Sequence, residues 1–212
     1  MIALFDVDRT LLRGSSARHF LLAGIRRRYF PLSSLWYMPR LYLRFWLGRM
    51  EAGSAGWEFP ILRGLTRERL EELARESFAA LRRDLRSRSA ALVARLQAEG
   101  WRVVFATTSL DLIVAPLAGH LGVTEVVASR LEFVDGRATG RFEGLPLLRE
   151  EKKRRVLEYL RARGERPEDC AFYSDSILDL PLLEVVGRPV AVNPDRRLAC
   201  TARRRGWSIL RL

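Results

Sequence analysis

Residues 2–11 read Ile-Ala-Leu-Phe-Asp-Val-Asp-Arg-Thr-Leu, an apolar run followed by two carboxylates two positions apart and a threonine. A short apolar run of this kind is typical of a strand at the buried centre of a parallel sheet. In α/β sheets, ligands bind beyond the carboxyl ends of such strands. Because side chains alternate along a strand, Asp6 and Asp8 would share a face, where they favour a counter-cation or a shared proton. The pattern therefore favours an active site over the alternative, a solvated turn with two aspartates.

The rest of the chain falls into two kinds of sequence. Between residues 13 and 87, apolar spacing predicts helices over 17–28, 33–49 and 66–81 and no strand, with Ser15 or Ser16 as the first N-cap. From residue 89, short apolar strands alternate with helices, and Asp135-Gly136 between extended residues predicts a hairpin. We expect strands at 102–107, 125–129, 170–173, 189–192 and 207–210, and helices at 89–99, 110–121, 150–163, 177–186 and 195–204.

This alternation predicts an α/β fold with a three-layer, Rossmann-like core built on a parallel sheet. The core domain would comprise residues 1–12 and 88–212. Residues 13–87 would form a helical domain inserted after the first strand. The length of 212 residues and the 48% apolar content suit one such core with a modest insertion.

The charge of the chain is strongly positive, with a formal net charge of +12. Of the 37 basic residues, only Lys152 and Lys153 are lysines. The arginines are spread along the chain and no nucleic-acid-binding motif is present, so we expect no nucleic-acid partner. The excess positive charge would instead attract anions such as phosphorylated substrates or acidic membrane surfaces.

The two cysteines and the two histidines are not expected to be catalytic. Cys170 and Cys200 are too few for a disulfide framework, and they lack the spacing of zinc ligands. We expect free thiols in a reducing compartment, and we expect His19 and His120 to pack or cap. The N-terminus lacks the features of a signal peptide and no apolar run is long enough to span a membrane, so the sequence predicts a cytoplasmic protein.

Polar residues stand at the ends of three predicted strands, and a lysine precedes the last of them. Because the carboxyl ends of parallel strands lie along one edge of a sheet, these residues would meet there. A cluster of four carboxylates needs a divalent cation, and oxygen ligands without nearby His or Cys favour Mg2+ over zinc. Hydroxyls and a lysine beside that cation suit a phosphoryl group. The residues concerned are Asp6, Asp8, Thr107, Thr108, Ser109, Lys152, Ser174, Asp175, Ser176 and Asp179.

The order of these residues resembles four motifs of the haloacid dehalogenase superfamily, and of its phosphatase branch in particular. The resemblance covers residues 1–12 and 88–212. The run from Asp6 to Thr10 is similar to the first motif, Asp-x-Asp-x-Thr, and Thr107 closes an apolar strand as the second motif does. Lys152 is similar to the third motif, with Lys153 as the reserve assignment, and residues 173–179 are similar to the fourth.

The resemblance implies a role for each motif. Asp6 would attack phosphorus and become an aspartyl-phosphate. Asp8 would protonate the leaving oxygen and then activate water, and the dehalogenases proper lack this carboxylate because a halide needs no proton. Thr107 would hold a phosphoryl oxygen, and Lys152 would neutralise charge there and on Asp6.

The resemblance also implies Mg2+ as the cofactor. Asp175 would hold the cation together with Asp6 and the Val7 carbonyl oxygen. Asp8 and Asp179 complete the candidate metal set, and Asp179 would either support the metal and its waters or be structural. The candidate substrate-binding residues are Arg9, Thr10, Thr108 and Asn193.

Several of these residues also have simpler interpretations. Thr107, or more readily Thr108 or Ser109, would cap the helix that follows the strand. Lys152 would lie on a solvated helix face. Asn193, within Val-Asn-Pro-Asp, would serve only a turn.

Residues 13–87 resemble the helical cap of the phosphoserine phosphatase branch, which implies a segment that shapes the pocket and excludes water. Two positions depart from that branch. Ser15 stands where a substrate-binding Glu is usual, and Leu178 stands where Asn precedes the last Asp. Arg9 replaces the usual small residue, so its side chain would extend toward the cap or the substrate.

Residues 29–57 are rich in aromatic and apolar side chains, interleaved and flanked with arginines. This composition favours helices that pack on one another. A second hypothesis is a lipid-phosphate substrate with peripheral membrane contact through the cap, as in the related phosphatidylglycerophosphatases.

Taken together, these observations predict a Mg2+-dependent phosphatase that hydrolyses a small phosphorylated metabolite or a lipid phosphate. One alternative is a phosphoserine phosphatase proper. Another, from a different class, is a non-catalytic basic module that binds acidic surfaces. The intact set of Asp6, Asp8, Thr107, Lys152 and Asp175 favours the enzyme over the binding module.

Overall fold

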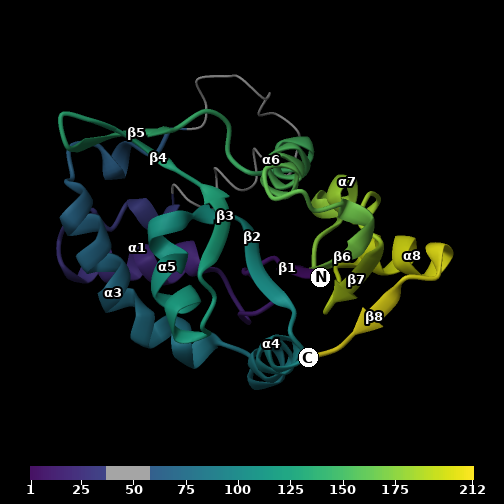
Figure 1. Ribbon diagram of the computed structural model, residues 1–212. Helices are drawn as coiled ribbons and strands as arrows, with labels where there is room; N and C mark the ends of the chain where they lie inside the picture. Colours follow the sequence, from purple (N-terminus) through teal and green to yellow (C-terminus); the bar gives the residue numbers. More distant parts are fainter. Residues whose placement is uncertain (37–57) are drawn as a thin grey trace.

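The computed structural model of the protein describes residues 1–36 and 58–212 (Figure 1). Its main sheet has six strands in the order β3-β2-β1-β6-β7-β8, and each neighbouring pair is parallel. The predicted α/β fold with a parallel sheet is therefore confirmed. The strands are β1 (Ile2–Phe5), β2 (Arg102–Leu110), β3 (Glu125–Ser129), β6 (Cys170–Ser174), β7 (Arg188–Val192) and β8 (Ser208–Leu210).

The apolar N-terminal strand β1 occupies the centre of this sheet, and all of its residues are buried. Ile2 is paired with Arg102 of β2 on one side and with Cys170 of β6 on the other. From β1 the chain builds outward through β2 to β3, and it then returns to build β6, β7 and β8 on the opposite side. The order of the strands therefore reverses between β1 and β6, which is the place where open α/β sheets bind ligands.

Helices cover both faces of the sheet and give the three predicted layers (Figure 1). On one face, α4 (Ser87–Ala98) and α5 (Asp111–His120) pack in an apolar cluster that includes Leu96 and Leu117. On the other face, α6 (Glu150–Arg161), α7 (Leu180–Leu183) and α8 (Arg196–Arg205) pack through residues such as Val156 and Leu198. A short 3-10 helix, η2 (Pro167–Asp169), precedes β6.

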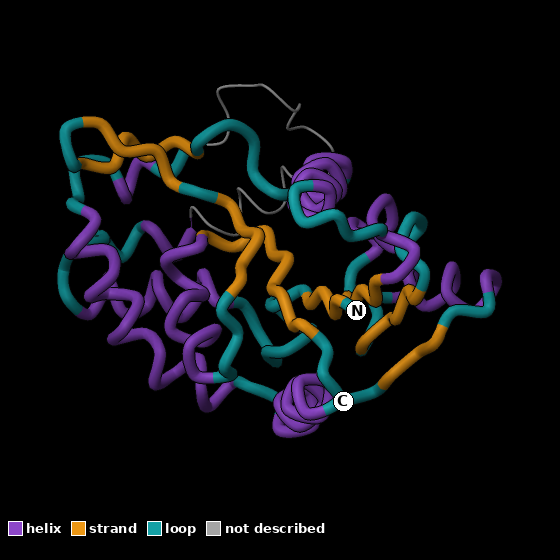
Figure 2. The backbone as a smooth tube through the Cα atoms, in the orientation of Figure 1, coloured by secondary structure: helices purple, strands orange, loops and turns teal. Residues whose placement is uncertain are grey.

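The described part of the segment between β1 and β2 contains α1 (Ser16–Arg26), the 3-10 helix η1 (Pro60–Leu62) and α3 (Arg67–Asp84). The hydroxyl oxygen of Thr66 caps α3 by accepting a hydrogen bond from the Arg69 N–H at 3.4 Å. Figure 2 shows α1 and α3 beside α5. They form a third apolar cluster with the first turn of α5, which includes Phe20, Leu73 and Ile113.

A hairpin of β4 (Leu131–Val134) and β5 (Arg137–Phe142) confirms the predicted turn, in which Asp135 and Gly136 both have positive φ. This hairpin also contacts the inserted segment, because the Phe59 N–H donates to the Gly140 carbonyl at 2.6 Å. At Gly140, where φ is 85°, a Cβ would lie 2.9 Å from the Phe59 carbonyl oxygen. Glycine therefore permits this close approach between the hairpin and residue 59.

Some expectations about local structure were wrong. The strand predicted to end at Thr107 continues to Leu110, with an irregular pairing after Thr107. The helix predicted over 177–186 is divided into η3 (Ile177–Asp179) and α7, because Pro181 has no amide hydrogen and its ring blocks a continuous helix. Other expectations have different outcomes. Ser15 occupies the predicted N-cap position of α1, without a side-chain hydrogen bond to that helix. Most of the helix predicted over 33–49 lies at residues 37–49, outside the described residues, and stays a prediction.

Within residues 1–36 and 58–212, no helix combines the length and the hydropathy that crossing a membrane requires.

Candidate active site

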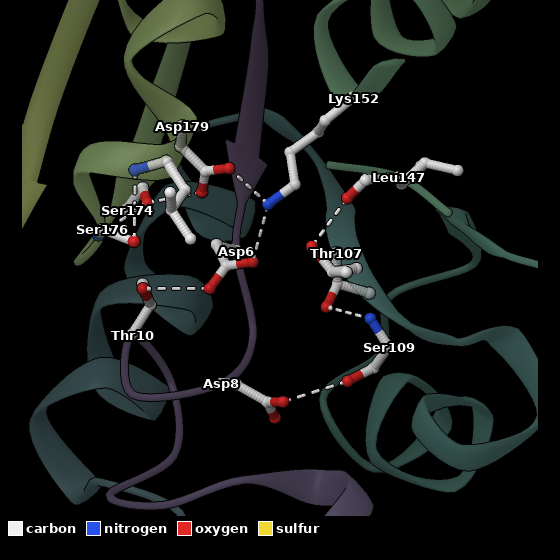
Figure 3. Close-up of polar contacts among 12 residues, drawn as sticks. Asp6, Asp8, Thr10, Thr107, Ser109, Leu147, Lys152, Ser174, Ser176 and Asp179 are labelled. Carbon is white, nitrogen blue, oxygen red and sulfur yellow. Dashed lines mark hydrogen bonds and ion pairs between the residues drawn. The ribbon is translucent and has the colours of Figure 1, made fainter. Parts of the chain in front are cut away.

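The polar residues predicted at the strand ends, with the exception of Ser174, line one cavity of about 290 Å³. Asp6 and Asp8 follow β1, Asp175 follows β6, and Thr107 lies on β2. Lys152 reaches the same cavity from the first turn of α6 (Figure 3). The cavity lies where the strand order reverses, so segments far apart in the sequence supply one site.

Lys152 forms the centre of the buried charge network. Its Nζ atom lies 3.0 Å from Oδ1 of Asp6 and 2.7 Å from Oδ1 of Asp179, and its side chain is only 2% exposed. Val156 and Leu160 share the buried face of α6 with Lys152 and direct it inward. Burial alone would lower the pKa of Lys152, but the carboxylates of Asp179 and Asp6 outweigh it and hold that pKa above its ordinary value. Lys152 is therefore a buried cation and does not lie on a solvated helix face.

Asp6 and Asp175 converge on a single hydroxyl. The Oγ1 atom of Thr10 lies 3.4 Å from Oδ2 of Asp6 and 3.3 Å from Oδ1 of Asp175. Burial raises the pKa of Asp6 well above its usual range, although Lys152 opposes this effect. Burial and the nearby Asp179 carboxylate raise the pKa of Asp175 to about 7. Both carboxylates thus lack sufficient positive charge around them for full ionisation.

The carboxylate of Asp8 points toward α1 and β2. Its Oδ1 atom accepts a hydrogen bond from the Ser16 N–H at 2.8 Å. Its Oδ2 atom accepts from the hydroxyls of Ser109 at 3.0 Å and Ser15 at 3.3 Å. The two hydroxyls of Ser16 and Ser109 are themselves 2.7 Å apart. Ser15 and Ser16 at the start of α1 and Ser109 on β2 therefore jointly fix the position of the Asp8 carboxylate.

Asp179 has a position different from that of a simple metal ligand. It binds Lys152, and its Oδ2 atom accepts a hydrogen bond from the Ser174 hydroxyl at 2.6 Å. The structure thus brings Asp6 and Asp175 toward each other and gives Asp8 and Asp179 other partners. The predicted metal site of four carboxylates stays a prediction, in which Asp6 and Asp175 share a neighbouring hydroxyl, that of Thr10.

Asp6 and Asp175 suit a hard divalent cation. Three buried carboxylates, including Asp179, face one buried ammonium group, and burial, with a further contribution from the neighbouring carboxylates, raises the pKa of Asp6 and of Asp175. Across the two described ranges, no three His, Cys, Asp or Glu side chains are grouped so that they could hold a metal ion. A cation on Asp6 and Asp175 would therefore need a backbone carbonyl, water and substrate oxygens as further ligands.

The hydroxyl residues on β2 do not cap α5. The Thr108 hydroxyl donates to the Leu147 carbonyl at 2.6 Å, and the Thr107 hydroxyl oxygen accepts from the Ser109 N–H at 3.2 Å. The N-cap position of α5 is Leu110, which has no side-chain cap. The capping interpretation of these residues is therefore wrong, and Thr107, Thr108 and Ser109 all line the cavity.

The remaining candidate residues differ in their placement. Arg9 lines the cavity from a left-handed backbone conformation with φ of 61°. Its charge partly opposes the rise in the pKa of Asp175 that burial and Asp179 cause. Asn193 is not among the residues lining this cavity. Its backbone has φ of 45°, and its Oδ1 atom accepts from the Leu212 N–H at 2.9 Å. These contacts agree with the turn interpretation of Asn193.

The residues expected to have structural roles behave accordingly. His19 lies 3.2 Å from Oδ2 of Asp84, and the ring of His120 packs edge-on to Phe78. Cys170 and Cys200 are free thiols.

Sequence reasoning did not identify the partners of Asp8. Ser16 and Ser109 are 93 positions apart, and no local pattern links them. The run that contains Ser16 was interpreted as a helix cap, and the run that contains Ser109 as strand-end hydroxyls of the site or, alternatively, as a cap. Neither interpretation paired these residues with Asp8. The apolar walls of the cavity were also missed, since a side chain that lines a cavity has the same hydropathy as one in the core.

Comparisons with known proteins show the family of this chain. A family model described as haloacid dehalogenase-like hydrolase matches residues 3–184. The histidinol-phosphatase of Neisseria meningitidis is 31% identical over 216 residues, which cover 99% of this chain and 97% of that protein. A phosphoserine phosphatase of Mycobacterium tuberculosis is 32% identical over 98% of this chain and 69% of its own length.

Solved structures show the same fold. A protein of unknown function from Bordetella pertussis has a TM-score of 0.88 and 33% identity, covering 99% of this chain and 97% of its own. A substrate-bound phosphoserine phosphatase has a TM-score of 0.68 and 19% identity, over 99% of this chain and 91% of its own. The second likeness shows the fold alone.

Proposed function

Because this chain belongs to the haloacid dehalogenase-like hydrolases and is a phosphatase of that family, we propose that it cleaves a phosphomonoester through an aspartyl-phosphate on Asp6. The observation that carries this proposal is the position of Asp6. Its carboxylate contacts the buried Lys152 on one side and lies near Thr10 and Asp175 on the other. A carboxylate held between a fixed cation and a second acid is suited to attack phosphorus.

In the first step, an Asp6 oxygen forms a bond to phosphorus while the ester P–O bond breaks. Asp8 donates a proton to the departing alcohol oxygen. In the second step, Asp8 takes a proton from water, the water oxygen bonds to phosphorus, and the bond to Asp6 breaks. Asp6 and Asp8 then return to their starting states, and inorganic phosphate is released.

Other residues stabilise the charge that develops in these steps. Lys152 would bind a phosphoryl oxygen while its charge favours the ionised form of Asp6, and the Thr107 hydroxyl would donate a hydrogen bond from β2. Mg2+, held by Asp6, Asp175 and the Val7 carbonyl oxygen, would neutralise phosphoryl oxygens. Asp179 would position Lys152 and would not bind the cation.

We further propose that residues 13–87 act as a cap domain over a core of residues 1–12 and 88–212. The contact of Ser15 and Ser16 with Asp8 supports this division. Through this contact, the position of α1 would decide how Asp8 is held, and closure would exclude water.

Membrane contact through the cap remains a separate hypothesis. Leu32 is 70% exposed and Trp36 is 78% exposed, and they follow the exposed Arg26 and Arg28. Aromatic and cationic side chains together suit an anionic lipid surface. Co-sedimentation with anionic vesicles at low salt tests this hypothesis, and failure to bind them would remove it.

Hydrolysis of p-nitrophenyl phosphate tests the enzymatic function against the non-catalytic alternative. We expect turnover that requires Mg2+ and that Asp6→Asn abolishes. Binding of acidic surfaces without any Mg2+-dependent turnover would favour the basic module instead.

A further inference from the structure

The walls of the cavity above the catalytic residues are apolar. They come from α1 and the residues after it, from the segment around η1, from α5 and from the end of β5. Four phenylalanine rings from segments far apart in the sequence contribute to these walls. The apolar lining residues include Phe20, Phe30, Phe59, Ile61, Ile113 and Phe142.

The charged groups of the cavity are confined to its floor. Among the described lining residues, the charged side chains are Asp6, Asp8, Arg9, Lys152, Asp175 and Asp179, which all belong to the four catalytic motifs. Arg9 acts electrostatically on Asp175, and Asp179 binds Lys152. The described walls therefore present no charged group to a substrate, whereas the floor is rich in charge.

The walls are held in place by packing. The rings of Phe59 and Phe142 meet edge to face with centroids 5.3 Å apart, and the rings of Phe20 and Phe30 are 6.0 Å apart. Gly24 makes room for Phe30, because a Cβ at position 24 would lie 2.1 Å from that ring. The shape of the chamber is thus set by tertiary contacts on both the inserted segment and the hairpin.

We propose that this chamber selects phosphomonoesters whose alcohol portion carries a compact apolar group and no carboxylate. The proposal rests on the phosphatase function proposed above and names the class of its substrate. An aromatic ring or a branched hydrocarbon would bury apolar surface against the phenylalanines. A carboxylate there would lose its hydration without gaining a charged partner among the described wall residues. The volume of about 290 Å³ lies at the lower end of ligand sites, so a compact group fits.

Three substrates separate this inference from the proposed function. Acetyl phosphate measures the phosphoryl chemistry alone, because its small leaving group does not reach the walls. 2-Phenylethyl phosphate supplies a compact ring, and O-phosphoserine supplies a charged amino acid. With Mg2+ present, we expect kcat/KM for 2-phenylethyl phosphate to exceed that for O-phosphoserine by at least roughly 100-fold.

A matched pair of variants locates the selectivity in the chamber. Ile61 lines the cavity, whereas Ile25 is half-buried in the same apolar cluster away from it. We expect Ile61→Ser to reduce the ratio of kcat/KM for 2-phenylethyl phosphate to that for acetyl phosphate by roughly tenfold. We expect Ile25→Ser to leave this ratio within about twofold, since that side chain does not meet the substrate.

The outcomes are distinguishable. If the enzyme hydrolyses acetyl phosphate but its kcat/KM for O-phosphoserine equals or exceeds that for 2-phenylethyl phosphate, the inference is overturned and the phosphatase function stands. An equal change of the ratio in both isoleucine variants would also overturn it. If none of the three substrates is hydrolysed in the presence of Mg2+, both proposals are overturned.

Discussion

The Nζ atom of Lys152 lies 3.0 Å from Oδ1 of Asp6, although 146 positions separate the two residues in the sequence. Both side chains are buried. A fixed positive charge at this distance favours the ionised form of Asp6 against the effect of burial, and only the ionised carboxylate can attack phosphorus.

Replacing Lys152 tests the role of this ion pair. We expect Lys152→Met to reduce kcat/KM by about 10²–10³, since it removes a preorganised charge from the transition state. Lys153→Met is the matched control, because Lys153 is the neighbouring lysine and pairs with the exposed Glu150 at 3.6 Å. Steady-state kinetics with p-nitrophenyl phosphate measure both. A larger loss in Lys153→Met would move the motif assignment to that residue.

The stability of the metal-free protein should depend on pH through Asp175. Burial first, and the Asp179 carboxylate second, raise the pKa of Asp175 to about 7, above its ordinary value of 3.8. The folded chain therefore keeps a proton that the unfolded chain releases, so stability falls as pH rises from about 4 to about 7. Mg2+ needs the ionised carboxylate, and so we expect it to raise the Tm more at about pH 8 than at about pH 5.

Thermal melts with a chelator or with Mg2+ measure this dependence. Asp175→Asn should flatten the decline between about pH 4 and pH 7 and remove most of the Mg2+ effect. A full Mg2+ shift in Asp175→Asn would rule out this residue as a ligand.

The function of Asp8 should be visible in how the reaction depends on the leaving group. Asp8→Asn cannot donate a proton, and an alkoxide needs that proton much more than p-nitrophenolate does. We expect kcat/KM for 2-phenylethyl phosphate to fall by about 10²–10⁴ and kcat/KM for p-nitrophenyl phosphate to fall less. Equal losses for the two substrates would show that Asp8 is not the acid of the first step.

The contact between the hairpin and the inserted segment can be tested at two glycines. Gly140 has positive φ and approaches the Phe59 carbonyl, whereas Gly144 has positive φ with no neighbour within 4 Å. We expect Gly140→Ala to cost about 1–3 kcal/mol of unfolding free energy, and Gly144→Ala to cost about 1 kcal/mol. Denaturant unfolding measures the difference in unfolding free energy. An equal loss in the two variants would show that the close approach to Phe59 does not require glycine at position 140.

Much of the fold and the catalytic floor could be predicted because their signals are local. An apolar run ending in Asp6 and Asp8 indicates a central strand and a site at its carboxyl end. Alternating strands and helices then specify a parallel sheet that brings Thr107 and Asp175 to the same edge. The position of Lys152 followed from its resemblance to a motif, and the buried face of α6 explains it physically.

The rest depends on tertiary contacts that leave no local pattern. Ser16 was interpreted as a helix cap and Ser109 as a strand-end hydroxyl or a cap, yet the Ser16 N–H and the Ser109 hydroxyl both bind Asp8. Ile61 lies in a stretch with weak periodicity, and only the folded chain shows that it faces a cavity. Asp179 was expected either to support the cation and its waters or to be structural, and only the folded chain shows that it lies 2.7 Å from Lys152.

The most direct test is to trap the phosphorylated enzyme. Borohydride reduces an aspartyl-phosphate to homoserine, so the enzyme is mixed with substrate and Mg2+, quenched with borohydride and mapped by peptide mass spectrometry. We expect homoserine at position 6, only when substrate is present, and none in Asp6→Asn. Homoserine at another aspartate, or rapid turnover with an unmodified Asp6, would contradict the account.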